Sequence, residues 1–101
     1  MFIFNITTNI EWSIHNEWLQ WMMNINIPRI LNTNCFKKYQ LVRLLETDET
    51  DGPTYALQLY TESKADYNRY IELYSAPIEQ AATQLWGDKL VSFQTLMHIV
   101  Q

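Results

Sequence analysis

The residues best suited to acid–base chemistry beside an aromatic wall are His15 and Trp18. They lie three positions apart, so on a helix they share one face. A histidine placed there could move a proton to or from a ligand in a helix–sheet cavity near Arg43 and Tyr55. One histidine at one such spacing is a weak pattern, and the simpler interpretation is a partly buried histidine that packs and hydrogen-bonds.

A second reactive side chain is Arg43, which lies in an apolar stretch between Leu41 and Leu45. The alternation of this stretch directs the guanidinium toward the helices, where a buried charge needs a partner or an anion. A structural carboxylate is the favoured partner, and a ligand carboxylate bound bidentately is the alternative. The candidate structural partners are Glu17, Asp66 and Glu72.

Three tyrosines at helical spacing form a third candidate feature. Tyr67, Tyr70 and Tyr74 fall at i, i+3 and i+7, which could line a pocket with hydroxyl groups. The favoured interpretation is that they are core and rim aromatics whose hydroxyls reach water. Together these features predict one candidate ligand pocket between helices and sheet. Its residues are His15, Trp18, Arg43, Tyr55 and Tyr67.

Other chemistries lack the residues that they need. The one cysteine, Cys35, permits no disulfide within the chain and no cysteine-based zinc cluster. His15 and His98 lack the spacing of a metal site, and the acidic stretch 46–51 lacks the pattern of a calcium loop. Two glycines cannot build a glycine-rich phosphate-binding loop. We therefore predict no metal and no cofactor.

Length and charge narrow the class of protein. The chain has 101 residues, 48% of them hydrophobic, which suits a single domain over 1–101 with one core. The net charge of −4 argues against a nucleic-acid partner. No stretch approaches the roughly 20 apolar residues of a membrane span, and the N-terminus lacks the basic start of a secretion signal. We expect a soluble, cytoplasmic protein.

The periodicity of the apolar residues predicts six main elements in the order β-α-β-β-α-β. Alternation with a period of two marks strands, and spacings of three and four mark helices. This order folds into a four-stranded antiparallel sheet with both helices on one face, an α+β ferredoxin-like sandwich. The strands are expected at 1–10, 36–46, 54–61 and 89–100, and the helices at 11–26 and 63–86.

Local chemistry predicts the details of the first helix. Asn9 or Ser13 could cap its start, and the two cannot be distinguished. Pro28 interrupts the helix and suits the first turn of a short second piece that ends near Thr33. The apolar stripe facing the sheet is expected to be Ile14, Trp18, Trp21, Met22 and Ile25.

The second helix carries its own boundary residues. Ser63 is expected as the N-cap, with Asp66 three residues later. Pro77 should kink or split the helix near Ala76, and Gly87 should end it.

One sheet face must receive the helices, and the other face, here called the open face, has no cover. It mixes aliphatic side chains with Asn and Gln, so water would meet a large apolar patch. We therefore predict a homodimer that stacks two open faces. The face under the helices is expected to carry Phe4, Ile6, Tyr39, Leu41, Tyr55, Leu57, Leu59, Val91 and Phe93. The open face is expected to carry Ile3, Asn5, Thr7, Gln40, Val42, Leu44, Ala56, Gln58, Tyr60, Leu90, Gln94 and Leu96.

Short segments in a fixed order extend over nearly the whole chain: 15–22, the Ile27-Pro28 break, 41–45, 55–60, and 87–89 before Phe93. In this order and spacing the chain resembles the small bacterial family called domain of unknown function 4286. That family is similar in fold to the dimeric α/β-barrel proteins, so the resemblance implies a sheet-stacked dimer. It implies no activity, cofactor or catalytic residue. Where such sequences are expected to carry His before the Ile-Pro break, this chain has Asn26.

Three classes of function stay open at this point. The first is a dimeric α/β-barrel module that binds a small molecule between helices and sheet. The alternative is a small cofactor-independent enzyme of the monooxygenase or isomerase type, which rests on fold analogy alone. The third, RNA or amino-acid sensing, is weakened by the acidic chain, by Tyr60 as the one available stacking aromatic, and by the absence of Gly after the first strand. A real cavity lined by His15, Trp18, Arg43 and Tyr55 would favour the enzyme, and a volume filled by side chains would exclude it.

Overall fold

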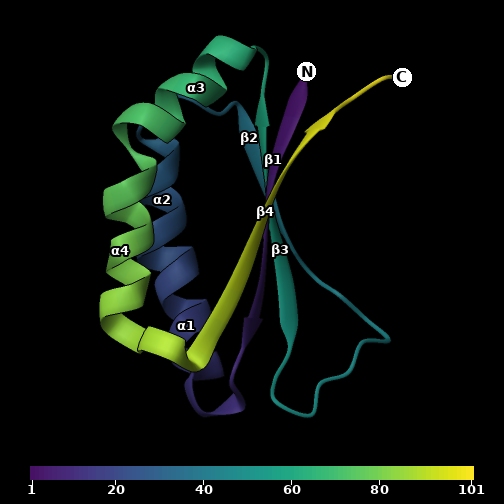
Figure 1. The fold of residues 1–101 in the computed structure, drawn as a ribbon, viewed down its shortest axis with the longest axis vertical. Helices are drawn as coiled ribbons and strands as arrows, with labels where there is room; N and C mark the ends of the chain where they lie inside the picture. Colours follow the sequence, from purple (N-terminus) through teal and green to yellow (C-terminus); the bar gives the residue numbers. More distant parts are fainter.

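The computed structural model describes residues 1–101 and places four antiparallel strands in the order β2-β3-β1-β4 (Figure 1). The predicted α+β ferredoxin-like fold is confirmed. The strands are β1 (Phe2–Ile10), β2 (Lys38–Arg43), β3 (Thr54–Thr61) and β4 (Leu90–His98). The helical segments are η1 (Trp12–Ile14), α1 (His15–Trp21), η2 (Met22–Asn26), α2 (Ile27–Leu31), α3 (Lys64–Leu73), α4 (Ser75–Trp86) and η3 (Gly87–Lys89).

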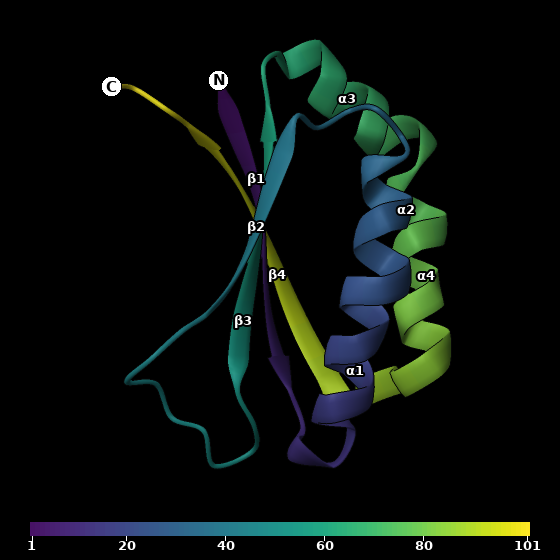
Figure 2. The same ribbon diagram turned by 180° about the vertical axis from the view of Figure 1, so that it is seen from behind.

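All helices lie on one face of the sheet, and the opposite face has no cover from the chain (Figure 2). The layer consists of the column α1-η2-α2 beside the column α3-α4. Trp21 and Trp86 join the two columns, with ring centroids 5.0 Å apart in an edge-to-face arrangement. None of the helices has both the length and the apolar character that a membrane span needs.

The first helical column contains a π-helical turn that the apolar spacing does not predict. In η2 the hydrogen bonds widen from i+4 to i+5, which inserts an extra residue and shifts every later side chain around the axis. Ile25, expected in the buried stripe, is therefore 54% exposed, while Asn26 is buried. Pro28 lies in the first turn of α2, which continues directly from η2.

The expected caps of the first helix are wrong. Neither Asn9 nor Ser13 accepts a hydrogen bond from the helix start. The Asn9 side chain instead donates to the carbonyls of Gly52 and Pro53 and to the Thr54 hydroxyl, and so fastens the loop before β3 to β1.

The second helical column follows its local sequence closely. Ser63 caps α3, since its Oγ accepts the Asp66 backbone N–H at 3.1 Å. The column breaks at Tyr74, between α3 and α4, because Pro77 has no N–H to offer to the carbonyl of Leu73. Gly87 ends α4 with a φ of 57°, which favours glycine.

The phase predicted for the last strand is wrong. β4 pairs with β1 so that Phe93 lies opposite Thr7 and Leu96 opposite Phe4. Residues opposite one another share a face, so Val91 and Phe93 lie on the open face, and Leu90, Gln94 and Leu96 lie toward the helices. The phases expected for the other three strands agree with the register, although β2 ends at Arg43 and so does not include Leu44, which was expected on the open face.

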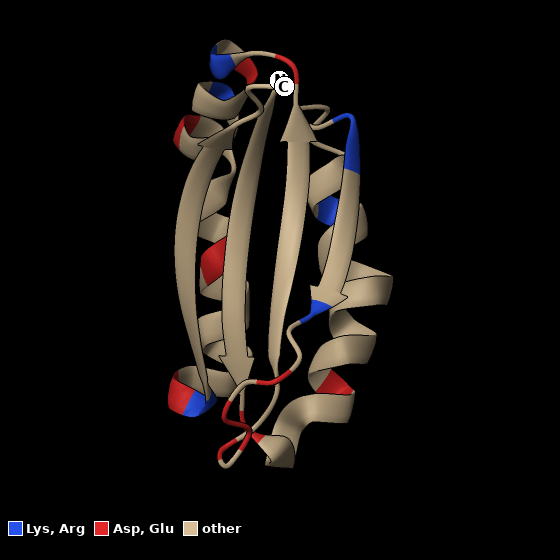
Figure 3. Cartoon of the chain, turned by 90° about the vertical axis from the view of Figure 1, so that its right-hand side faces the viewer, with Lys and Arg blue, Asp and Glu red and all other residues tan.

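The open face carries almost no charge. Figure 3 shows no Asp or Glu on its strands and basic residues only near the two ends of β2. Two large apolar side chains of β4 are solvent-exposed on it, Val91 at 55% and Phe93 at 66%. By register it comprises Ile3, Asn5, Thr7, Asn9, Lys38, Gln40, Val42, Thr54, Ala56, Gln58, Tyr60, Val91, Phe93, Thr95 and Met97.

The hydrophobic core lies between the sheet and the helices. Its central side chains are nearly inaccessible to water, with Leu59 at 0% and Ile30 at 1% exposure. Burying one such side chain stabilises the fold by about 1.5–3 kcal/mol. The core members are Phe4, Ile10, Ile14, Trp18, Met22, Ile27, Ile30, Cys35, Phe36, Tyr55, Leu57, Leu59, Tyr70 and Ile78.

Candidate functional site

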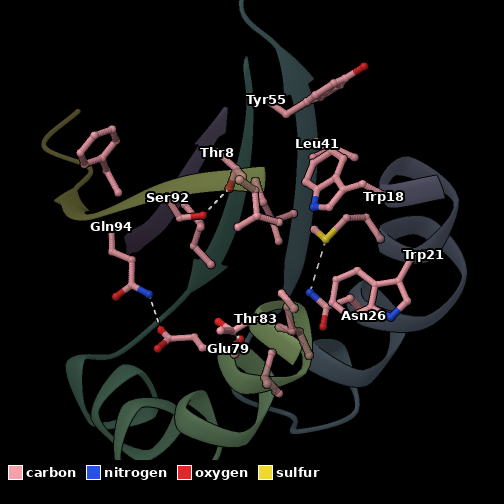
Figure 4. Close-up of a pocket in the computed structure, with 18 of the residues that line it drawn as sticks. Thr8, Trp18, Trp21, Asn26, Leu41, Tyr55, Glu79, Thr83, Ser92 and Gln94 are labelled. Atoms are coloured by element: carbon pink, nitrogen blue, oxygen red, sulfur yellow. Dashed lines mark hydrogen bonds between the residues drawn. The ribbon is translucent and has the colours of Figure 1, made fainter. Parts of the chain in front are cut away.

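A cavity of about 660 Å³ lies between the sheet and the helical columns (Figure 4). Most of its lining is apolar, and its size is that of pockets that hold drug-sized molecules. The deep part of the wall is formed by buried side chains of α1, η2, α2, α3, α4 and β3. These are Trp18, Met22, Asn26, Ile30, Leu57, Tyr70 and Ile78.

The cavity opens between α4 and β4. Most lining residues on this side are exposed, whereas the deep wall is buried. The Gln94 side-chain amide donates a hydrogen bond to the Glu79 carboxylate across the opening. The exposed lining residues are Glu79, Thr83, Gly87, Ser92, Phe93 and Gln94.

The lining holds few polar groups, and a single one is charged. Thr8 of β1 and Ser92 of β4 share a hydrogen bond of 2.9 Å between their hydroxyls, so the pair can rotate to donate to or accept from a ligand. Glu79 at the mouth is the one charged lining residue, and the lining contains no lysine, arginine or histidine. Burial raises the pKa of the Tyr70 hydroxyl, which therefore keeps its proton and stays a donor.

Asn26 is a buried polar side chain in this wall. The π-helical turn brings it inward, where it is 7% exposed beside Met22 and Ile30. Its amide Nδ2 donates to the Met22 sulfur at 3.4 Å, and its Oδ1 accepts from Arg29 Nη2 at 3.2 Å. Asn26 is not among the site residues predicted from the sequence. Its spacing could have indicated this position, because Trp18, Met22 and Asn26 follow one another at intervals of four residues and so share one helix face.

A second cluster lies beside the cavity, at the junction of α1 with β2 and β3. His15 Nε2 and the Tyr55 hydroxyl share a hydrogen bond of 2.7 Å, and the Trp18 ring packs edge-on against Tyr55 at 5.3 Å. Burial, and then the positive charge of Arg43, lower the pKa of His15, while Glu49 raises it. The imidazole is therefore neutral near pH 7 and could accept a proton.

The partner expected for Arg43 is wrong, and so is its burial. Its side chain is 38% exposed at the end of β2, over the rings of Trp12 and Tyr55 at 5.8 and 5.9 Å. Glu49, from the loop between β2 and β3, binds the guanidinium with contacts of 3.0–3.3 Å. These hydrogen bonds with Glu49 raise the pKa of Arg43. The loop supplied this carboxylate because it is adjacent in sequence, whereas the three expected carboxylates lie on helices.

The five predicted site residues separate into three groups. His15 and Arg43 lie in the cluster but do not line the cavity. Trp18 and Tyr55 belong to both, although Figure 4 shows the Tyr55 hydroxyl directed away from the other lining side chains. Tyr67 lies elsewhere, against Phe4 at a ring distance of 5.4 Å.

The structure contains no group of three or more His, Cys, Asp and Glu side chains that could hold a metal ion. Cys35 is free and buried. The chemistry available around the cavity is therefore that of hydroxyl, amide, indole and carboxylate groups.

Solved structures with the same fold include proteins of several activities. A dimeric ferredoxin-like protein from an uncultured marine organism has a TM-score of 0.68 at 8% identity, covering 99% of this chain and 95% of that one. The cofactor-independent oxygenase SnoaB from Streptomyces nogalater has a TM-score of 0.66 at 14% identity, covering 99% and 94%. A hydroxynitrile lyase from Passiflora edulis has a TM-score of 0.60 at 19% identity, covering 99% and 96%. At these identities the likeness shows the fold alone.

The curated proteins contain no match to this chain. The chain belongs to the family described as "Domain of unknown function (DUF4286)", which it matches over residues 1–100.

Proposed function

We propose that this protein is a homodimeric module that binds an uncharged, largely apolar small molecule in the cavity between helices and sheet. The observation that carries the proposal is the cavity itself. Its volume of about 660 Å³ gives room for a small molecule between the core and the cavity mouth. Its apolar wall with a few polar groups is typical of ligand sites.

The charge of the lining supports a neutral ligand. An anion entering this cavity would lose its water and meet Glu79 at the mouth with no cation to pair with. A neutral ring system would bury its apolar surface against Trp18, Leu57 and Ile78 at little desolvation cost.

The homodimer is proposed to form through the open face. The scarcity of charge on its strands and the exposed Val91 and Phe93 make this face costly to leave in water. A two-fold axis lying between the two sheets and parallel to them would place apolar and amide groups of one copy against those of the other. Structures of the same fold include proteins described as dimeric ferredoxin-like proteins, which supports a dimer without showing its face.

The alternative is a cofactor-independent enzyme of the monooxygenase or isomerase type. The neutral His15, hydrogen-bonded to Tyr55 and beside Arg43, favours it, because this cluster could take a proton from a bound substrate. The enzyme alternative is weakened because neither His15 nor Arg43 lines the cavity.

The binding proposal is tested by filling the cavity. Ala82 of α4 lines it, whereas the neighbouring Ala81 does not. Ala82→Phe should abolish binding of tetralin, a neutral bicyclic hydrocarbon used as the probe in ligand-observed NMR, and Ala81→Phe should retain it. If the wild-type protein binds neither tetralin nor its ketone, 1-tetralone, the proposed function is wrong.

A further inference from the structure

The deep wall of the cavity contains an amide donor with a poor partner. Asn26 is buried, and the acceptor of its Nδ2 hydrogen bond is the thioether sulfur of Met22 at 3.4 Å. A thioether is a weak acceptor, and an amide nitrogen has two hydrogens to donate. Asn26 therefore retains donor capacity directed at the space that a ligand would occupy.

Arg29 fixes which end of this amide faces the cavity. Its guanidinium lies outside the wall and can only donate hydrogen bonds, so it must meet the carbonyl oxygen of Asn26, and it does so at 3.2 Å. The amide nitrogen is left on the cavity side, which Figure 4 shows with its bond to Met22. Arg29 is thus a positioning residue for Asn26.

A second donor faces the same space. The indole ring of Trp18, 3% exposed, lies above Asn26 in Figure 4 with its nitrogen turned toward the amide. Tyr70, also part of this buried wall, carries a hydroxyl. The charged group of the lining, Glu79, is at the opposite end, at the mouth. The deep end therefore offers hydrogen-bond donors without a net charge.

We propose that the deep end of the cavity binds the carbonyl oxygen of a neutral cyclic ketone or a similar uncharged carbonyl compound, through Asn26 Nδ2 and the Trp18 indole N–H. This assignment rests on the proposed binding function and adds the ligand class to it. A neutral acceptor would use the spare donors, and an apolar molecule of the same shape would leave them unsatisfied. A carboxylate is disfavoured because no cation is present to offset its desolvation.

The test compares two ligands of one carbon skeleton, 1-tetralone and tetralin, which differ by the carbonyl oxygen. The quantity measured is the ratio of their dissociation constants, obtained by NMR titration. Asn26→Leu replaces the amide with an apolar side chain of similar size and so removes the donor. The preference for 1-tetralone should then fall about tenfold, which corresponds to the loss of one hydrogen bond. Asn24→Leu, at an exposed residue of the same turn, is the matched control and should leave the ratio unchanged.

A second variant keeps the test independent of the stability of Asn26→Leu. Arg29→Met leaves Asn26 in place but frees its amide to rotate, so the ratio should fall by a smaller factor. If both ligands bind and neither variant changes the ratio, the carbonyl assignment is overturned while the binding function stands. If neither ligand binds the wild-type protein, the proposed function itself fails, and the carbonyl assignment with it.

Discussion

His15 and Tyr55, which are 40 residues apart in sequence, share a hydrogen bond of 2.7 Å between the imidazole Nε2 and the phenol hydroxyl. This bond ties the start of α1 to β3 beside the cavity. Burial and the Arg43 charge disfavour the imidazolium, so they lower the pKa of His15 in the folded protein.

Acidification should therefore destabilise the protein through His15. Its pKa is lower in the folded state than the ordinary value of about 6.5, so above that pH both states are neutral at this position. As the pH falls below about 6.5, the unfolded chain takes up the proton first, and the free energy of unfolding decreases. Urea unfolding at several pH values should show a smaller decrease in His15→Gln than in wild type. Equal decreases in the two proteins would contradict this account.

The cap of α3 should contribute measurably to stability. Ser63→Ala removes the acceptor of the Asp66 N–H and should cost about 1 kcal/mol of unfolding free energy. Ser13→Ala is the matched control, since Ser13 caps no helix and bonds the exposed Glu11 carboxylate. Chemical denaturation should place the control within about 0.5 kcal/mol of wild type. Equal losses in the two variants would mean that the cap has no special role.

The two glycines should tolerate alanine to different degrees. A Cβ on Gly52 would lie 1.7 Å from the carbonyl oxygen of Ile10, so the loop would have to move away from β1. Gly52→Ala should cost about 2–3 kcal/mol. Gly87 has open space around it and a φ of 57°, so Gly87→Ala should cost about 1–2 kcal/mol through backbone strain alone. Thermal unfolding of both variants would measure the order, and the reverse order would contradict the close approach of Gly52 to Ile10.

The proposed dimer predicts a specific effect on the open face. Phe93→Asp places a charge opposite Thr7, where the partner's face would exclude water, and should convert the dimer to a monomer. Leu85→Asp replaces a similarly exposed apolar residue on α4 and should leave the dimer intact. Size-exclusion chromatography with light scattering distinguishes the two states. A wild-type monomer at micromolar concentration would contradict the dimer.

The helix boundaries could be predicted because the residues that start, break and end a helix act locally. Ser63, Pro77 and Gly87 act through the backbone of their own neighbours, so their effects are readable without tertiary contacts. The phase of β4 could not be read in this way. Both of its sides carry apolar residues, such as Leu90 and Val91, so alternation alone does not choose a face, and pairing with β1 decides it.

Only the part of the candidate site that follows from helix spacing and strand neighbours could be predicted from the sequence. His15, Trp18, Arg43 and Tyr55 do lie together, because α1 crosses the ends of β2 and β3. Their role as ligand residues stays a prediction. The cavity next to them depends on how far α4 stands from β4, which no sequence pattern encodes. The inward position of Asn26 depends on a π-helical turn, which breaks the 3.6-residue period from which the stripe was read.

The central claim is that the space between helices and sheet is a binding site. Two-dimensional ¹H–¹⁵N NMR during titration with 1-tetralone tests it directly, because the Trp18 indole N–H and the Asn26 side-chain amide each give separate signals. Both signals should move in a saturable way, and neither should move in Ala82→Phe. Signals that stay in place, or changes confined to the open face around Val42 and Val91, would contradict the claim.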